Sequence, residues 1–130
     1  MFPPLKITFL GTGTSSGVPM IACGCPVCTS PDKKDKRLRT SVLIQSDTTT
    51  IVIDTTPDFR CQMLRANVKN LDAVLYTHSH KDHTAGMDDV RAYNFFQGRS
   101  MPVYATQPTI NALMGEFSYV FADKKYPGVP

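Results

Sequence analysis

The segment of residues 71–96 contains three kinds of sequence, and their order strongly limits the possible folds. An apolar run at residues 71–75 predicts a short buried strand, and residues 86–96 can form a helix. Between them stands His78-Ser79-His80-Lys81-Asp82-His83, which contains all 3 histidines of the chain. We therefore expect these six residues to form a turn that joins a strand to a helix.

The spacing inside this turn is typical of metal ligands. Alternate residues of an extended chain project to the same side, so His78, His80 and Asp82 can point together. His83 adds a ligand near the start of the helix, where the macrodipole favours a nearby anion. A structural zinc ion rarely takes so many ligands from a single turn. The alternative, a solvated polar loop, is disfavoured by the strand on one side and the helix on the other.

The residues Thr77-His78-Ser79-His80-Lys81-Asp82-His83 resemble the T-H-x-H-x-D-H signature of the metallo-β-lactamase superfamily. This resemblance implies that His78 and His80 hold one metal ion and that Asp82 and His83 hold a second. Asp54 follows an apolar strand, where it could be a simple turn residue. In the superfamily, an aspartate at this place supports the metal ligands, because ligating histidines need orienting partners. Asp82 and Asp54 are therefore the candidate catalytic residues.

Three of the 4 cysteines form the pattern C-x-C-x-x-C at Cys23, Cys25 and Cys28. Such close thiols suit a metal better than a disulfide framework, and thiolates select zinc. The site is one ligand short of a tetrahedral zinc centre. Cys61, a segment absent from the chain, or another chain could supply the fourth ligand, and three free thiols are the alternative. The pattern resembles the structural zinc loop of phosphoribosyl cyclic phosphate phosphodiesterases and of pyrroloquinoline-quinone biosynthesis proteins.

Two further segments bear on substrate binding, for which the sequence assigns no residue. The loop at residues 11–17 has glycines spaced G-x-G-x-x-x-G, and Val18-Pro19 follows it rather than a helix, which disfavours dinucleotide binding. The loop resembles a stretch that lies near the substrate in one metallo-β-lactamase branch. The basic run at residues 33–39 is most simply a solvated loop. Its alternative is a phosphate contact through Arg37 or Arg39.

The remaining pattern predicts an α/β chain of the α+β kind. We expect strands at residues 6–10, 41–45, 51–53, 71–75 and 101–105. Helices should begin at Thr56-Pro57-Asp58 and cover residues 86–96 and 108–117, with Phe59, Met63, Leu64 and Met114 in the core. The resemblance implies the N-terminal half of a four-layer αββα sandwich, a mixed sheet with helices on one face. Residues 1–130 would form one domain, and the C-terminal half of the fold would be absent.

Composition limits the partners. Hydrophobic content of 42% and charged content of 19% are those of an ordinary globular protein, and a net charge of +3 favours neither nucleic acid nor membrane. No stretch approaches the ~20 apolar residues of a membrane span. We therefore expect a cytoplasmic chain without a membrane partner.

The function that follows is a metal-dependent hydrolase, closest in motifs to the phosphoribosyl 1,2-cyclic phosphate phosphodiesterases. Its substrate would be a small, cyclic phosphodiester, and its nucleophile a hydroxide held by two metal ions roughly 3.5–4 Å apart. Zn²⁺ or Mn²⁺ could occupy the two active-site positions, because His and Asp ligands accept either, and a further structural Zn²⁺ would bind the cysteine loop. With all histidines committed to metal, none remains to activate a serine or cysteine.

Two alternatives belong to other classes. One is a tRNA 3′-processing endonuclease of the same superfamily, although the thin basic run and the cysteine loop do not favour a nucleic-acid partner. The other is a truncated, catalytically inactive metal-binding module. The family's second half supplies another metal-binding histidine, a bridging aspartate and a last histidine, and this chain resembles only the first half. A longer protein or a homodimer would have to complete the site.

Overall fold

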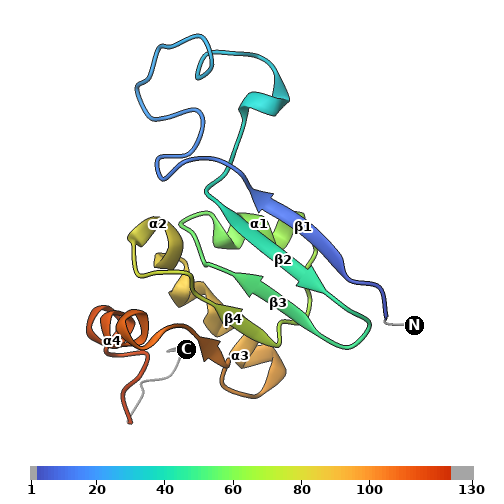
Figure 1. The fold of residues 1–130 in the computed structure, drawn as a ribbon, viewed down its shortest axis with the longest axis vertical. Helices are drawn as coiled ribbons and strands as arrows, with labels where there is room; N and C mark the ends of the chain where they lie inside the picture. The colour runs from blue at the N-terminus through green and yellow to red at the C-terminus, as the bar shows by residue number, and fades with distance from the viewer. Residues whose placement is uncertain (1–2, 124–130) are drawn as a thin grey trace.

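The computed structural model describes residues 3–123, so both ends of the predicted domain, residues 1–2 and 124–130, lie outside the described residues. The strands and helices follow one another along the chain as Figure 1 shows. They are β1 (Lys6–Gly11), η1 (Lys33–Asp35), β2 (Ser41–Gln45), β3 (Thr50–Ile53), α1 (Phe59–Arg65), β4 (Ala73–Leu75), α2 (Lys81–Thr84), η2 (Met87–Val90), α3 (Arg91–Gln97), β5 (Val103–Tyr104) and α4 (Gln107–Glu116), where η denotes a 3₁₀ turn.

The strands form one mixed sheet in the order β1-β2-β3-β4-β5. The pairs β1–β2 and β2–β3 are antiparallel, whereas β3–β4 and β4–β5 are parallel. The tight turn after β2, where the Ser46 amide donates to the Thr49 carbonyl at 2.8 Å, forces antiparallel pairing. Helical crossovers after β3 and β4 return the chain to the same end of the sheet, which makes these pairs parallel. The predicted mixed sheet is confirmed.

One face of this sheet packs against the helices and forms the core. Leu43, Val52 and Val74 face this side from adjacent strands, and each is at most 1% exposed. Phe59 of α1 and Leu113 of α4 belong to the same buried cluster. The helices therefore lie on one side of the sheet, as the resemblance implied.

The other face of the sheet is apolar but remains open in the described part of the chain. Ile7, Phe9 and Tyr104 are 60%, 69% and 60% exposed. Phe9 pairs with Val42, and the row continues through Ile53 and Leu75 to Tyr104. Because a soluble fold rarely leaves such a patch uncovered, this face has the character of an interface with another layer.

Several local predictions were wrong, for geometric reasons. The helix expected from Thr56-Pro57-Asp58 begins at Phe59, and the Thr56 hydroxyl accepts a hydrogen bond from the Asp58 amide at 3.0 Å before the helix starts. Leu64 lies five positions after Phe59, about 140° around the helix, so it is 63% exposed. Met114 is 48% exposed because its neighbour Leu113 takes the inward position.

The elements near the end of the chain are also shorter than predicted. The helix expected over residues 86–96 is divided into the 3₁₀ turn η2 and the helix α3. The strand expected over residues 101–105 retains only the two residues of β5. Among the helices of residues 3–123, none is long and apolar enough to cross a membrane.

Candidate metal centre

The topology gathers the predicted site residues at one edge of the sheet. The strands β1, β3, β4 and β5 run in the same direction, so their carboxyl ends share this edge. The glycine loop follows β1, Asp54 follows β3, and residues 77–83 follow β4. In Figure 1 this edge carries α2 and the long loop between β1 and β2. The carboxyl ends of parallel strands are a common place for binding sites in α/β proteins.

The three histidines are neighbours in space. The ring centroids of His78 and His80 lie 4.6 Å apart, and those of His78 and His83 lie 4.1 Å apart. His80 has extended backbone, with φ −63° and ψ 146°, and it immediately precedes α2. Asp82 was expected to continue this extended alternation, but it lies in the first turn of α2. The helix, rather than the strand period, therefore places Asp82 beside His83.

Asp82 and His83 meet at a distance suited to a shared metal ion. The Nε2 atom of His83 lies 3.1 Å from Oδ2 of Asp82. Two ligand atoms about 2.05 Å from one tetrahedral zinc ion lie about 3.3 Å apart. The observed separation is therefore close to an edge of such a coordination shell.

Asp54 is the most heavily bonded side chain of this region. It is 3% exposed and has a φ of 64°, a left-handed conformation that Asp and Asn adopt more readily than most residues. Its carboxylate accepts hydrogen bonds from the Thr77 amide at 2.8 Å, from the Thr77 hydroxyl at 2.7 Å and from Nδ1 of His83 at 2.8 Å. Asp54 thus joins the end of β3 to both ends of the histidine motif.

These bonds determine which nitrogen of each ring carries the proton. Because the Asp54 carboxylate only accepts, Nδ1 of His83 must donate. The Thr77 hydroxyl gives its one proton to Asp54, so Nδ1 of His78, 2.9 Å away, must donate to the Thr77 oxygen. In the neutral rings, the Nε2 lone pairs of His78 and His83 are left available to a metal ion.

Residues that the sequence did not single out hold α2 in place. The Thr55 amide donates to the His83 carbonyl at 2.9 Å, and the Gly86 amide donates to the Thr55 carbonyl at 2.9 Å. The Thr55 hydroxyl also lies 2.6 Å from the hydroxyl of Tyr76, whose burial raises its pKa. Thr55 is fully buried, and a buried threonine after a strand gave no recognisable signal in the sequence.

The glycine loop packs directly against the basic run. The Gly13 amide donates to the Leu38 carbonyl at 2.7 Å, and a Cβ atom on Gly13 would lie 2.6 Å from the Arg37 carbonyl oxygen. Arg39 donates to Asp58 at 3.1 Å and to the Ser15 carbonyl at 3.1 Å. The guanidinium of Arg39 therefore fixes the loop to the start of α1.

The cysteine loop forms a compact thiol cluster. The sulfur atoms of Cys23, Cys25 and Cys28 all lie within 4.8 Å of one another. The Cys28 amide donates to the sulfur of Cys25 at 3.4 Å, and this bond is the main reason that the pKa of the Cys25 thiol falls to about 7. Cys61, proposed from the sequence as a fourth ligand, lies in α1 and is not part of this cluster.

Within residues 3–123, the cysteine cluster is the one group of three or more His, Cys, Asp or Glu ligand atoms so close together. His78, His80, Asp82 and His83 instead approach one another in pairs. The sequence predicted that all four would converge, and the structure brings them to one place without closing them into one tight group. Three thiols this close suit a zinc ion.

Comparison with known proteins identifies the family of the chain. The family model described as "Beta-lactamase superfamily domain" matches residues 49–130. A protein of Porphyromonas gingivalis named octanoyltransferase is 46% identical over 127 residues, which are 97% of this chain but 25% of that protein. A Methylobacterium radiotolerans protein named coenzyme PQQ synthesis protein B is 26% identical, over 84% of this chain and 40% of its own length.

Solved structures give the same picture of partial coverage. The crystal structure of a diphosphatase from the PhnP family is 48% identical, with a TM-score of 0.85, over 91% of this chain and 49% of that one. Zn²⁺-bound PqqB from Methylobacterium extorquens has a TM-score of 0.71 at 24% identity, over 84% of this chain and 40% of its own, and shows the shared fold. The chain spans a quarter to a half of the length of these relatives.

Proposed function

Since the chain belongs to the metallo-β-lactamase superfamily, we propose that it carries part of the metal centre of a hydrolase that cleaves a small, cyclic phosphodiester. The observation that supports this proposal best is the bonding of the histidine motif. Asp54 and Thr77 hold the Nδ1 protons of His83 and His78, which leaves the Nε2 lone pairs of both rings to act as ligands. Metal sites commonly use such a carboxylate to orient a ligating histidine.

The residues suit divalent metal ions in chemistry, and one pair of them suits a shared ion in spacing. We assign His78 and His80 to one ion and Asp82 and His83 to a second, as in the superfamily signature. The 3.1 Å separation of the Asp82 and His83 ligand atoms supports the second assignment. The thiols of Cys23, Cys25 and Cys28 would hold a separate structural zinc ion.

When bound, such ions would supply a nucleophile at neutral pH by lowering the pKa of water, and would polarise a phosphoryl oxygen. The chain's own residues prepare the site for them. Asp54 holds the proton on Nδ1 of His83, so we treat Asp54 as a positioning residue that acts through His83. Asp82 would supply a negatively charged oxygen ligand to the second metal ion, beside Nε2 of His83. Zn²⁺ and Mn²⁺ both accept this set of nitrogen and oxygen ligands.

A diphosphate is the second candidate substrate. The solved structure that is 48% identical to this chain over the aligned residues is described as a diphosphatase, and the chain covers 49% of it. Both candidate substrates react at phosphorus, so the same set of metal ligands would serve either of them. A comparison of rates on a 2′,3′-cyclic nucleotide and on a nucleoside diphosphate distinguishes them directly.

We also propose that a segment or chain beyond these residues completes the site. The open apolar face of the sheet, with Ile7, Phe9 and Tyr104 exposed, supports a missing layer. A partner layer on that face would abut the edge that carries the histidine motif, since the motif follows β4 of the same sheet. Hydrolysis by the isolated chain should therefore be much slower than by a protein that supplies the missing layer.

The test is the metal content of the purified chain, measured by elemental analysis on protein of known oligomeric mass. We expect two to three metal ions per chain when the missing ligands are supplied. A variant with both His78→Asn and His80→Asn should lose active-site metal and keep the cysteine-bound zinc. A double variant with unchanged metal content, or a wild type that binds only the cysteine zinc in every assembly, would refute the assignment. A chain with full metal content but no hydrolysis of either substrate would instead be a binding module.

A further inference from the structure

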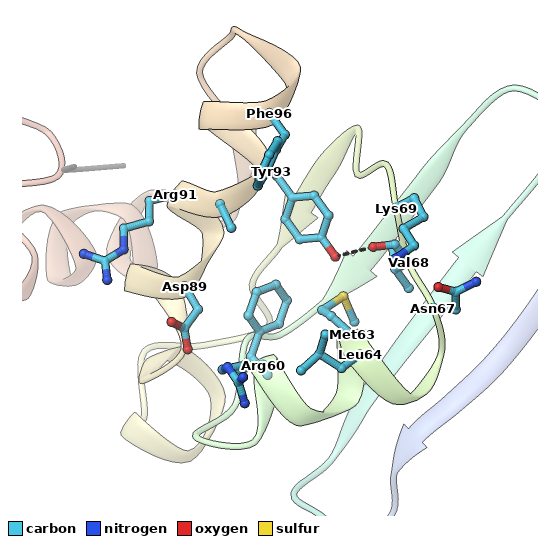
Figure 2. A pocket seen from close by; sticks show the side chains of 12 residues that line it. Arg60, Met63, Leu64, Asn67, Val68, Lys69, Asp89, Arg91, Tyr93 and Phe96 are labelled. Carbon is cyan, nitrogen blue, oxygen red and sulfur yellow. Dashed lines mark hydrogen bonds between the residues drawn. The ribbon is translucent and has the colours of Figure 1, made fainter. Parts of the chain in front are cut away.

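A groove between α1 and α3 lies outside the candidate metal centre (Figure 2). Its volume is about 680 Å³, within the usual range for small-molecule sites. None of the residues that line it is a predicted metal ligand. They are Phe59, Arg60, Met63, Leu64, Asn67, Val68, Lys69, Asp89, Arg91, Ala92, Tyr93 and Phe96. The groove is therefore a separate feature of the helical layer.

The lining of this groove is mainly apolar. Phe59, Met63 and Val68 are buried beneath it, whereas Leu64 and Phe96 are 63% and 84% exposed at its walls. Exposed side chains of this size beside a buried apolar floor are costly in water, which favours an apolar occupant.

Tyr93 contributes its ring without leaving a polar group unpaired. Its hydroxyl donates to the Val68 carbonyl at 2.8 Å, as the dashed line in Figure 2 shows. Burial raises the pKa of Tyr93 to about 12, so the phenol stays neutral at physiological pH. The ring also packs edge-on against Phe59, with centroids 6.4 Å apart. The middle of the groove therefore offers an apolar surface with its one hydroxyl already satisfied.

Charged side chains line both ends of the groove. Figure 2 shows Asn67 and Lys69 at one end and Arg60, Asp89 and Arg91 at the other, with the Arg91 guanidinium directed away from the middle of the groove. Asp89, the one carboxylate among the lining residues, lies at the Arg60 end, so the Lys69 ammonium has no carboxylate of the lining beside it. Within residues 3–123, no hydrogen bond or ion pair engages the Lys69 ammonium. The Asn67 side-chain amide adds a hydrogen-bond donor at the same end.

The groove and the open sheet face lie on opposite sides of the sheet. The apolar row from Phe9 to Tyr104 lies on the side of the sheet away from the core, whereas Phe59 and Met63 pack in the core with the helices. A further layer on the open face would therefore lie on the other side of the sheet from the groove.

We propose that this groove binds a soluble amphiphile with an apolar chain and a single anionic head group, of which a medium-chain fatty acid is the simplest form. The chain lies along Met63, Leu64, Tyr93 and Phe96. The head group meets Lys69 and Asn67, at the end of the groove that has no lining carboxylate. This assignment does not depend on the metal centre.

Methyl NMR of ¹³C-methionine protein, titrated with decanoate below its micelle concentration, tests the proposal. Met63 lies in the groove, and Met20 and Met101 lie elsewhere, so only the Met63 signal should shift in a saturable way. A ligand that bound the open sheet face would leave Met63 unchanged. Absence of a saturable Met63 shift would overturn the proposal.

The role of the head group is tested with a charge reversal. Lys69→Glu should weaken decanoate binding about fivefold or more, whereas the uncharged decanol should bind both proteins equally. Lys34→Glu, the same change in an exposed 3₁₀ turn, should have no effect. Unchanged Met20 and Met101 signals show that the Lys69→Glu protein is folded. Equal decanoate affinity in the wild type and Lys69→Glu would refute the assignment of the anionic end.

Discussion

Replacing Asp54 by asparagine is the sharpest test of the site, because it keeps the shape of the side chain while it removes the negative charge and turns one hydrogen-bond acceptor into a donor. Asparagine has the same shape and tolerates the φ of 64° that this position adopts. Alanine would add backbone strain and a small cavity, so it is the poorer choice.

The consequence follows from the three bonds that the Asp54 carboxylate accepts. Thr77 donates its amide and its hydroxyl, and His83 donates from Nδ1. If the asparagine oxygen keeps the bond to the Thr77 amide, its NH₂ group faces His83, and two donors then meet. His83 can respond by moving its proton to Nε2, where the Asp82 carboxylate accepts it across 3.1 Å. Nε2 of His83 and Oδ2 of Asp82, the two ligand atoms of the second metal position, would then be hydrogen-bonded to each other.

The expected magnitude is large enough to measure. Loss of such an orienting partner typically lowers metal affinity by about 10–100-fold, or about 1.4–2.7 kcal/mol. Stability should change less, because the Thr77 hydroxyl can rotate and accept from the new amide. Competition with a chelating dye gives the zinc affinity, and urea unfolding gives the stability.

A second measurement needs no metal. Long-range ¹H–¹⁵N spectra report which nitrogen of His83 carries the proton. The wild type should have its proton on Nδ1, and Asp54→Asn should move it to Nε2. Asp47→Asn, the same change of charge in an exposed turn, is the control. A variant that keeps both the wild-type tautomer and the wild-type zinc affinity would refute the positioning role of Asp54.

Three further predictions address the loops and the open face. Gly13→Ala should destabilise the protein by about 1–3 kcal/mol in urea unfolding, because its Cβ atom would meet the Arg37 carbonyl oxygen at 2.6 Å. Gly24→Ala, whose Cβ atom would have no atom within 4 Å, should be nearly neutral. Equal effects of the two variants would contradict the close packing of the loop. Cys25→Ser should remove one zinc ion per chain by elemental analysis and Cys61→Ser none, and the same loss in both would exclude a Cys25 ligand. Phe9→Thr, at a site 69% exposed on the open face, should reduce self-association in sedimentation velocity without loss of stability. Unchanged association would show that copies of the chain do not associate through this face.

The elements that the sequence predicted correctly are those with a strong period or a strong turn signal. The hairpin of β2 and β3 was expected from its two Val/Ile-rich runs and the polar turn between them, and it is observed. The helix α1 was expected to have Leu64 in its core face, but a helix of 7 residues buries only one narrow stripe. The sequence did not show how short the helix is, because Thr56, Pro57 and Asp58 have the character of a helix start but precede its first residue, Phe59.

The residues of the candidate site also differ in whether the sequence could predict them. The choice of His78, His80, Asp82 and His83 came from residue type and spacing, which local sequence contains, and their metal binding remains a proposal. Thr55 and Tyr76 gave no such signal, because their roles arise from contacts between β3, β4 and α2. The left-handed backbone of Asp54 was equally invisible, since most such positions hold glycine.

By itself, then, the sequence determined which residues can act as ligands and which segments form strands and helices, because these depend on neighbours in the chain. Only the tertiary structure decided which imidazole nitrogen is held by a hydrogen bond, which side of the sheet lacks a cover and where the groove between α1 and α3 lies. Each of these depends on atoms far apart in the chain. Thr77 reaches Asp54 across 23 positions and His83 reaches it across 29, and neither separation has a period that a sequence can display.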